Sequence, residues 1–307
     1  MNIDTLCFSS GGIQGISFLS ALKFLVDNKY IILKNINMYA GTSIGSIICF
    51  LLIIGCTPNE LILFFSDYNF KTIEPDLSLD LLFENFGFSS FDNILELLRN
   101  FSNKKLNFTE ISMYDFYILT NKKFIMNSTN FNNGDELIMS YETTPELSVF
   151  TALRMSSAIP LIYVPILYND NYYLDGALSN SILLNHCNYN TTIGFFIETI
   201  KNFKLDSISE LINGSLIILS NKINYDISKY KIIKIKLEII KFTKLDILAN
   251  DIKKIFTKGK KYAELFYINE LKNEISKINK CINTKIELTV NVVMNKIIEE
   301  IEFNSNK

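Results

Sequence analysis

The pentapeptide Gly41-Thr42-Ser43-Ile44-Gly45 has the Gly-x-Ser-x-Gly spacing that can present a serine hydroxyl as a nucleophile. Where such a pattern joins a strand to a helix, the tight turn forces unusual backbone angles on the serine, and the flanking glycines avoid Cβ clashes. The Ser43 hydroxyl would then lie near a helix N-terminus, where backbone N–H groups favour developing negative charge. The same residues also suit an ordinary helix cap, since helices commonly begin after Ser or Thr. The pentapeptide alone leaves both interpretations open.

A second glycine-rich stretch, Ser9-Ser10-Gly11-Gly12-Ile13-Gln14-Gly15, follows the first apolar run of the chain. Adjacent glycines between a strand and a helix let main-chain N–H groups approach an anion, either a phosphate or the oxyanion of a tetrahedral intermediate. A dinucleotide fingerprint would need Gly in place of Ser10 and an acidic residue about 20 positions later, and a P-loop would need Gly-Lys-Ser/Thr. Neither is present, so the nucleotide interpretation has little support.

A serine nucleophile needs a base, and the chain has a single histidine, His186. A lone histidine in an "LLNHCNYN" context is typical of a surface or packing residue. Asp175-Gly176-Ala177 offers another candidate, because it sets a carboxylate at the end of an apolar-aromatic strand. An ordinary Asp-Gly turn without a catalytic role would have the same sequence pattern.

The elements that must position these residues form two successive βα units. A strand over 5–9 and a strand over 36–40 each lead into a glycine-containing turn and then into residues at helical spacing, the second helix over 46–55. This order predicts an α/β fold with a mainly parallel sheet and helices on both faces. Further strands are expected over 123–131, 171–178, 192–199 and 230–240. Helices are expected within 60–116, from about 145 to before Pro160, and beyond 245.

The 307-residue chain, with 48% hydrophobic residues and a net charge of −2, is expected to fold and not to bind nucleic acid. The apolar run Ile44–Cys56 is too short to cross a bilayer, and the N-terminal residues lack the basic region of a signal peptide. We therefore expect a cytoplasmic location. Without repeats or linkers, residues 1–307 are interpreted as one domain, with a core over about 5–200, an insert over about 60–116, and C-terminal strands and helices over about 201–307.

Charge is spread unevenly along the chain. Residues 231–280 contain 13 Lys against 6 Asp or Glu. Such a stretch is typical of a solvated helix surface, and it is also compatible with attraction to an anionic lipid surface.

The three motifs, in this order, resemble the patatin-like phospholipase family: Gly11-Gly12-Ile13-Gln14-Gly15, Gly41-Thr42-Ser43-Ile44-Gly45 and Asp175-Gly176-Ala177. The segment "TTPELSVFTALRMSSAIP" between the last two is similar to the one that precedes the Asp-Gly motif in that family, and "LANDIKKIFTKGKKYAELF" is similar to its closing helix. The resemblance extends from Leu6 to about Phe266, least of all over 60–105.

This resemblance implies a three-layer α/β/α fold and a Ser-Asp dyad without histidine. Ser43 would be the nucleophile, and Asp175 would accept its proton. The N–H groups of Gly11, Gly12 and Ile13 would form the oxyanion hole, with Gly15, Gly41, Gly45 and Gly176 supporting the motifs. No metal or other cofactor is implied. The implied activity is hydrolysis of fatty-acyl esters of phospholipids, of the phospholipase A or lysophospholipase type, by a protein peripheral to membranes.

Two alternatives stay open at this point. The same machinery would serve a general carboxylesterase or a triacylglycerol lipase, and a catalytically quiet lipid-binding protein could keep the fold. Two departures from the family pattern favour the last alternative: Ser10 stands where a third glycine is usual, and Gln14 stands where Lys or Arg is usual. The adjacent Ser156 and Ser157 are interpreted as hydrogen-bonding residues at a helix end. The motifs do not indicate an oligomeric state.

Overall fold

A computed structural model describes residues 3–67, 78–200, 214, 217–218, 225–238 and 249–305 of the chain. The chain divides into two compact units, Met1–Ala263 and Glu264–Lys307. Helix α9 (Ala249–Ser305) begins in the first unit and makes up the described part of the second. The assignment of the whole chain to one domain stays a prediction.

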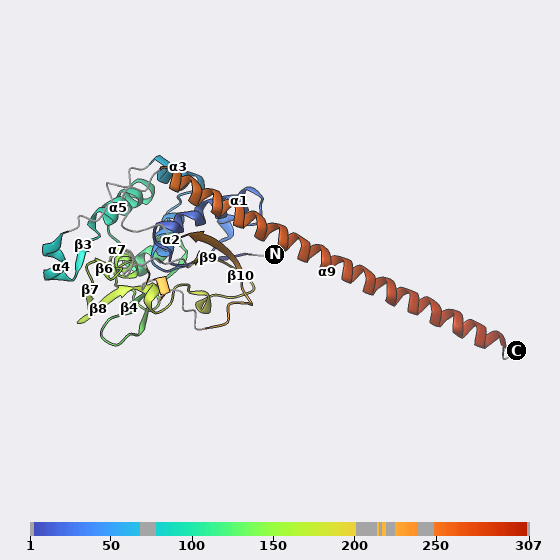
Figure 1. Ribbon diagram of the computed structural model, residues 1–307. Coiled ribbons are helices and arrows are strands. Elements are labelled where there is room, and N and C mark those ends of the chain that lie inside the picture. Colours follow the sequence, from blue (N-terminus) through green and yellow to red (C-terminus); the bar gives the residue numbers. More distant parts are fainter. Residues whose placement is uncertain are drawn as a thin grey trace. The chain divides into compact units, whose positions relative to one another are not determined.

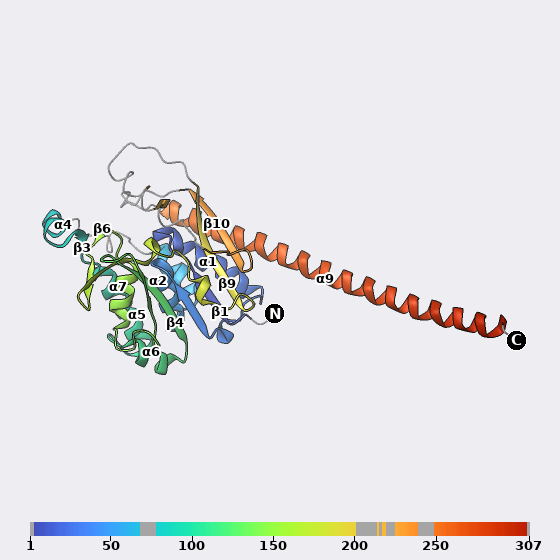
Figure 2. The same ribbon diagram turned by 90° about the horizontal axis from the view of Figure 1, so that it is seen from below.

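A mixed sheet of eight strands forms the centre of the first unit (Figures 1 and 2). Parallel strands stand in the order β10-β9-β1-β2-β4, and β8, β7 and β5 join antiparallel at the β4 side. The strands are β1 (Thr5–Phe8), β2 (Met38–Gly41), β4 (Lys123–Asn130), β5 (Glu136–Met139), β7 (Ile166–Tyr168), β8 (Asn171–Asp175), β9 (Thr192–Ile200) and β10 (Lys231–Glu238). The predicted α/β fold with a mainly parallel sheet is confirmed.

The register of β1 places two loops at one edge of this sheet. Phe8, the last residue of β1, stands opposite Gly41 of β2 on one side and Phe195 of β9 on the other. The carboxyl ends of neighbouring parallel strands lie together, and ligand sites of α/β folds form at such edges. The glycine-rich loop after β1 and the Ser43 turn after β2 therefore leave the sheet side by side.

Helices α1 (Ser17–Asp27) and α2 (Ile44–Ile53) each connect adjacent parallel strands, and right-handed crossovers place both on one face of the sheet. Phe8 points to this face and packs against Phe18 of α1, with ring centroids 5.7 Å apart. On the opposite face, Cys7 and Ala40 belong to a core cluster with Ile182–Leu184. Every residue of α2 from Gly45 to Ile53 is buried, which explains its uninterrupted apolar sequence.

The insert is helical, as predicted, and its helices are α3 (Pro58–Asp67), α4 (Leu79–Asn85), α5 (Asp92–Leu106) and α6 (Met113–Thr120). Phe116 of α6 stacks on Phe50 of α2, so part of the insert covers the helical layer. The sequence did not predict the small two-stranded sheet in which β3 (Gly87–Ser89) pairs with β6 (Leu161–Tyr163). Residues 68–77 of the predicted insert lie outside the described residues.

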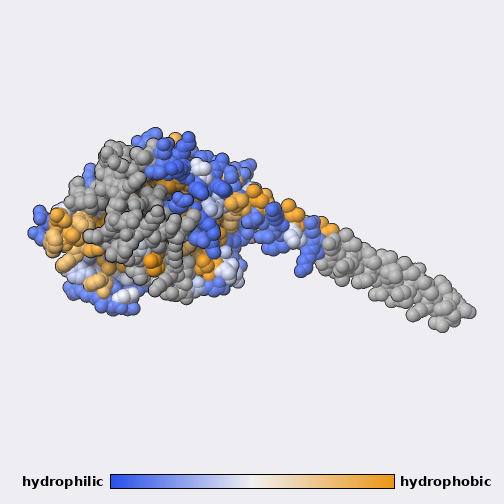
Figure 3. All heavy atoms as spheres, viewed as in Figure 1, coloured by the Kyte–Doolittle hydropathy of each residue, from blue (hydrophilic) through white to orange (hydrophobic). Residues whose placement is uncertain are grey.

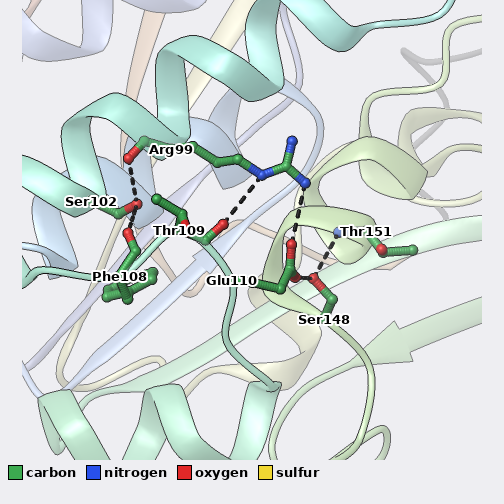
Figure 4. Close-up of polar contacts among 7 residues, drawn as sticks. All are labelled: Arg99, Ser102, Phe108, Thr109, Glu110, Ser148 and Thr151. Carbon is green, nitrogen blue, oxygen red and sulfur yellow. Dashed lines mark hydrogen bonds and ion pairs between the residues drawn. The ribbon is translucent and has the colours of Figure 1, made fainter.

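Helix α7 (Val149–Ser156) begins later than the predicted start near Pro145. The carbonyls of Pro145 and Leu147 accept hydrogen bonds from the first N–H groups of α6, so these residues are held in a turn. Ser148 caps α7 by accepting from the Thr151 N–H at 3.4 Å and also donates to Glu110. Glu110 in turn forms an ion pair with Arg99 of α5 (Figure 4). The start of α7 is thus fixed by contacts with the insert.

The first turns of α9 belong to the first unit. Ile252 and Ile255 are buried, and Gly259 lies so close to α1 that a Cβ there would be 2.1 Å from the Ser17 carbonyl oxygen. The helices expected beyond residue 245 are a single helix over the described residues. None of the helices within the described ranges has the length and hydrophobicity that crossing a bilayer requires.

Candidate active site

Ser43 lies at a sharp turn between β2 and α2. Its backbone angles, φ 55° and ψ −125°, fall in a region that non-glycine residues rarely adopt. The flanking glycines permit this turn because a Cβ on Gly45 would be 2.3 Å from the Phe8 carbonyl oxygen, and one on Gly41 would be 2.5 Å from the Gly45 backbone. Both positions exclude any side chain, so the strand-to-helix elbow expected from the pentapeptide is present.

The Ser43 hydroxyl donates a hydrogen bond of 2.6 Å to Oδ2 of Asp175. Asp175 is the last residue of β8, and its other carboxylate oxygen, Oδ1, accepts from the Ala177 N–H at 2.8 Å. Gly176 makes this turn possible, since a Cβ there would be 2.4 Å from Oδ1 of Asn127. Two predicted site residues 132 positions apart are thus in direct contact.

Burial changes the acidity of this carboxyl group. Asp175 is only 4% exposed, and desolvation raises its pKa from 3.8 to about 6. The hydrogen bonds from Ser43 and Ala177 favour the charged form and oppose the rise in pKa. The group remains ionised at neutral pH, and its carboxylate is a better proton acceptor than an ordinary aspartate.

Ser156, in the last turn of α7, holds the strained backbone of Ser43. The Ser43 N–H donates a 3.0 Å hydrogen bond to the Ser156 hydroxyl oxygen, and both residues are buried. The sequence predicted a helix-terminal role for Ser156 and missed this contact. The neighbouring Ser157 is also buried, and its hydroxyl has no hydrogen-bond partner among the described residues.

Asn127 of β4 connects the two halves of the site. Its side-chain oxygen accepts from the Thr42 hydroxyl at 2.9 Å, next to Ser43. Its amide nitrogen donates to the Gly176 carbonyl at 3.1 Å, next to Asp175. The sequence analysis did not single out Asn127, although a fully buried amide within a strand is itself a signal of a structural hydrogen-bond role.

The glycine-rich loop after β1 packs against Ile44, the residue that follows Ser43. Gly12–Ile16 form a short 3₁₀ helix, η1, preceded by Gly11, and Gly12 has a φ of 52°. A Cβ on Gly15 would be 2.5 Å from the Ile44 side chain, so this glycine lets η1 pack directly against the start of α2. The N–H groups of Gly12 and Ile13 lie in the first turn of η1. The N–H groups of a first helical turn have no acceptor within the helix.

The remaining predicted positions have structural contacts. The Gln14 side chain is buried and donates to the Glu238 carbonyl, which ties η1 to the end of β10. The Ser10 N–H donates to the Ser181 carbonyl at 2.9 Å. His186 is exposed in the 3₁₀ helix Leu184–His186, and it is not among the hydrogen-bond partners of Ser43 and Asp175 in the described part of the chain. The described residues contain no group of three or more His, Cys, Asp or Glu side chains arranged to hold a metal ion.

Fold and site together define an α/β protein with a buried Ser-Asp pair at a strand-to-helix elbow beside a glycine-rich loop. A sequence model described as "Patatin-like phospholipase" matches residues 6–186, more than half of the chain. The chain therefore belongs to the patatin-like phospholipase family, as its motifs indicated.

Proteins of two viruses are similar in sequence to this chain. The chain is 37% identical over 180 residues to "Probable lipid hydrolase 463L" of Invertebrate iridescent virus 6. This alignment covers 58% of this chain and 60% of that protein. It is 33% identical over 196 residues to "Uncharacterized protein R571" of Acanthamoeba polyphaga mimivirus, covering 62% of this chain and 64% of that protein. The similarity therefore spans less than two thirds of either relative.

A solved structure supports the fold. The crystal structure of VipD from Legionella pneumophila superposes with a TM-score of 0.57 at 14% sequence identity, over 87% of this chain and 67% of that one. At this identity the likeness concerns the fold alone.

Replacing Ser156 by Ala should destabilise the protein, because the buried Ser43 N–H would lose its acceptor. An unsatisfied buried donor costs about 1–3 kcal/mol of unfolding free energy. Ser157→Ala is the matched control, since that hydroxyl has no partner to lose, and we expect no loss of stability on its removal. Urea denaturation of both variants measures the difference, and equal stabilities would contradict this role of Ser156.

Proposed function

We propose that this protein is a serine acyl hydrolase that cleaves fatty-acyl esters of phospholipids through a Ser43–Asp175 dyad, without a metal. The observation that carries the proposal is the 2.6 Å hydrogen bond between a serine at a strained elbow and a buried carboxylate. Family membership and a relative named as a probable lipid hydrolase support a lipid ester as substrate.

In the first half of the reaction, Ser43 Oγ attacks the ester carbonyl carbon while its proton passes to Asp175 Oδ2. The carbonyl oxygen becomes an oxyanion, which the N–H groups of Gly11, Gly12 and Ile13 would stabilise. When the tetrahedral intermediate collapses, the alcohol leaves with the proton from Asp175. For a phospholipid this alcohol is the lysophospholipid, and the fatty acid remains esterified to Ser43.

In the second half, water attacks the acyl-enzyme and its proton passes to Asp175. Collapse of the second intermediate releases the fatty acid and returns the proton to Ser43 Oγ. A single carboxylate thus serves as base and acid in turn, which the pKa of about 6 suits better than an ordinary aspartate would. The hydrogen bond from Ala177 keeps Oδ1 occupied and leaves Oδ2 directed at Ser43.

An exposed apolar surface on the first unit supports work at a lipid surface. Large exposed side chains gather where α4 and β3 lie (Figure 3). We call this the apolar patch, and its members are Leu79, Phe83, Phe86, Leu161 and Leu167, with Phe83 79% exposed. Exposed apolar patches of this kind are typical of interaction sites.

The apolar patch is joined to the Ser-Asp pair through a short stretch of chain. The Ala158 carbonyl accepts from the Asp175 N–H at 2.8 Å, and Leu161 follows three residues later in β6. Leu161 and Phe86 both have positive φ angles, 67° and 64°, which bulky residues seldom adopt. Strained backbone at two exposed members of the patch supports a role for the patch in binding.

We propose that the protein works in the cytoplasm, peripheral to membranes.

A fluorophosphonate probe tests the dyad, because it reacts with an activated serine. We expect one covalent adduct on Ser43, lost in Ser43→Ala and strongly reduced in Asp175→Asn, with Ser157→Ala labelled like the wild type. Peptide mass spectrometry locates the adduct. A folded wild-type protein that is not labelled would support a lipid-binding protein without catalysis. Faster release of fatty acid from triacylglycerol than from phospholipid vesicles would support the lipase alternative.

Replacing Phe83 by Ser should weaken binding to phosphatidylcholine vesicles by about tenfold or more, since burial of a large apolar side chain contributes about 1.5–3 kcal/mol. Ile118→Ser is the matched control, because Ile118 is an exposed apolar residue of α6. Vesicle co-sedimentation measures binding, and turnover of a soluble short-chain ester should stay unchanged in both variants.

The salt dependence of vesicle binding distinguishes the apolar patch from the lysine-rich residues 231–280 as the membrane-binding surface. Helix α4, which carries Leu79 and Phe83 of the apolar patch, contains the acidic Asp80 and Glu84 and no basic residue, so binding through the patch should not weaken in high salt. Binding that requires anionic lipid and disappears in high salt would instead implicate residues 231–280.

A further inference from the structure

The second unit carries an exposed apolar stripe along α9. Ile268, Leu271, Ile275, Ile278 and Ile282 are each between 41% and 58% exposed. Their spacing of three, four, three and four residues places them on one side of the helix. We call these five residues the α9 seam.

The α9 seam is narrow. Every residue from 269 to 280 that does not belong to it is polar: Asn269, Glu270, Lys272, Asn273, Glu274, Ser276, Lys277, Asn279 and Lys280. A helix that packs on a globular core shows a wider apolar face with a period of 3.6 residues. A strict two-in-seven seam with a period of 3.5 is the pattern of a coiled coil.

Among the described residues, the second unit contains no element besides α9. This helix continues beyond the seam to Ser305. Most helical stability in proteins comes from packing of an apolar face, and an isolated helix in water is only marginally stable. A partner helix that covers the seam would supply that packing.

From these observations, we infer that the protein self-associates through the α9 seam as a parallel two-stranded coiled coil with a second copy of this chain. In the heptad notation, Ile268, Ile275 and Ile282 occupy a positions, and Leu271 and Ile278 occupy d positions. Isoleucine at a with leucine at d favours two parallel strands, whereas isoleucine at both positions favours three or four. The layer at Leu271 is the basis for the two-stranded form. Identical seams from two copies match in length and register without a further component.

The charges of residues 264–280 favour binding to a protein partner over binding to a membrane surface. Residues 264–280 contain three Glu and three Lys, so the segment carries no net charge. Two copies therefore face no net repulsion. Helices that lie on anionic membranes instead carry an excess of Lys and Arg and a broad apolar face.

Sedimentation equilibrium of the full-length protein tests this inference. We expect a mass of twice the 35.3 kDa chain for the wild type. The double variant Ile275→Lys with Ile278→Lys places charges in the seam and should have the mass of one chain. The matched control Asn273→Lys with Ser276→Lys adds the same charges at positions outside the seam and should remain dimeric.

Labelling of Ser43 by the fluorophosphonate probe shows whether each variant is folded, because Ser43 lies in the first unit and α9 residues 264–282 in the second. The self-association does not depend on the proposed activity, so either can fail alone. A monomeric wild type at micromolar concentration would overturn the inference, and so would a seam variant that stays dimeric. A mass of three chains would overturn the two-stranded form.

Discussion

The hydrogen bond between Ser43 and Asp175 is the contact on which the organisation of this site depends. Ser43 lies in the turn after β2 and Asp175 ends β8, and these two strands do not pair with each other. Strand β4 lies between them in the sheet, and Asn127 on β4 binds the neighbour of each partner. The elbow glycines, the β4 amide and the turn after β8 thus all hold one 2.6 Å contact in place.

This contact carries costs that the rest of the fold must offset. Burial of the Asp175 carboxylate disfavours its charged form, and two hydrogen bonds compensate only in part. The backbone of Ser43 is strained as well, and Ser156 satisfies its N–H. The unbroken apolar packing of α2 between the sheet and the insert supplies stabilisation for a turn that is unfavourable by itself.

The sequence predicted the residues of the motifs better than the residues that hydrogen-bond to the motifs and position them. The βα units, the elbow and the Asp-Gly turn follow from local glycine and apolar patterns, and the structure places them as expected. Asn127 and Ser156 were missed because their roles depend on long-range contacts, 85 and 113 positions from Thr42 and Ser43. Which of two adjacent serines faces the elbow depends on the helical phase of α7, which the insert fixes through Glu110 and Ser148. The pairing of β3 with β6 was unpredictable for the same reason.

The central claim is that Asp175 accepts the proton of Ser43, and the pH dependence of ester hydrolysis tests it most directly. Burial raises the Asp175 pKa to about 6, so the carboxylate loses its capacity to accept a proton as the pH falls through that value. For a soluble short-chain ester, kcat/KM of the wild type should fall about tenfold for each pH unit below 6 and level off above it. Asp175→Asn should be nearly inactive at every pH. A rate that stays constant from about pH 4 to 8, or an active Asp175→Asn variant, would contradict the account.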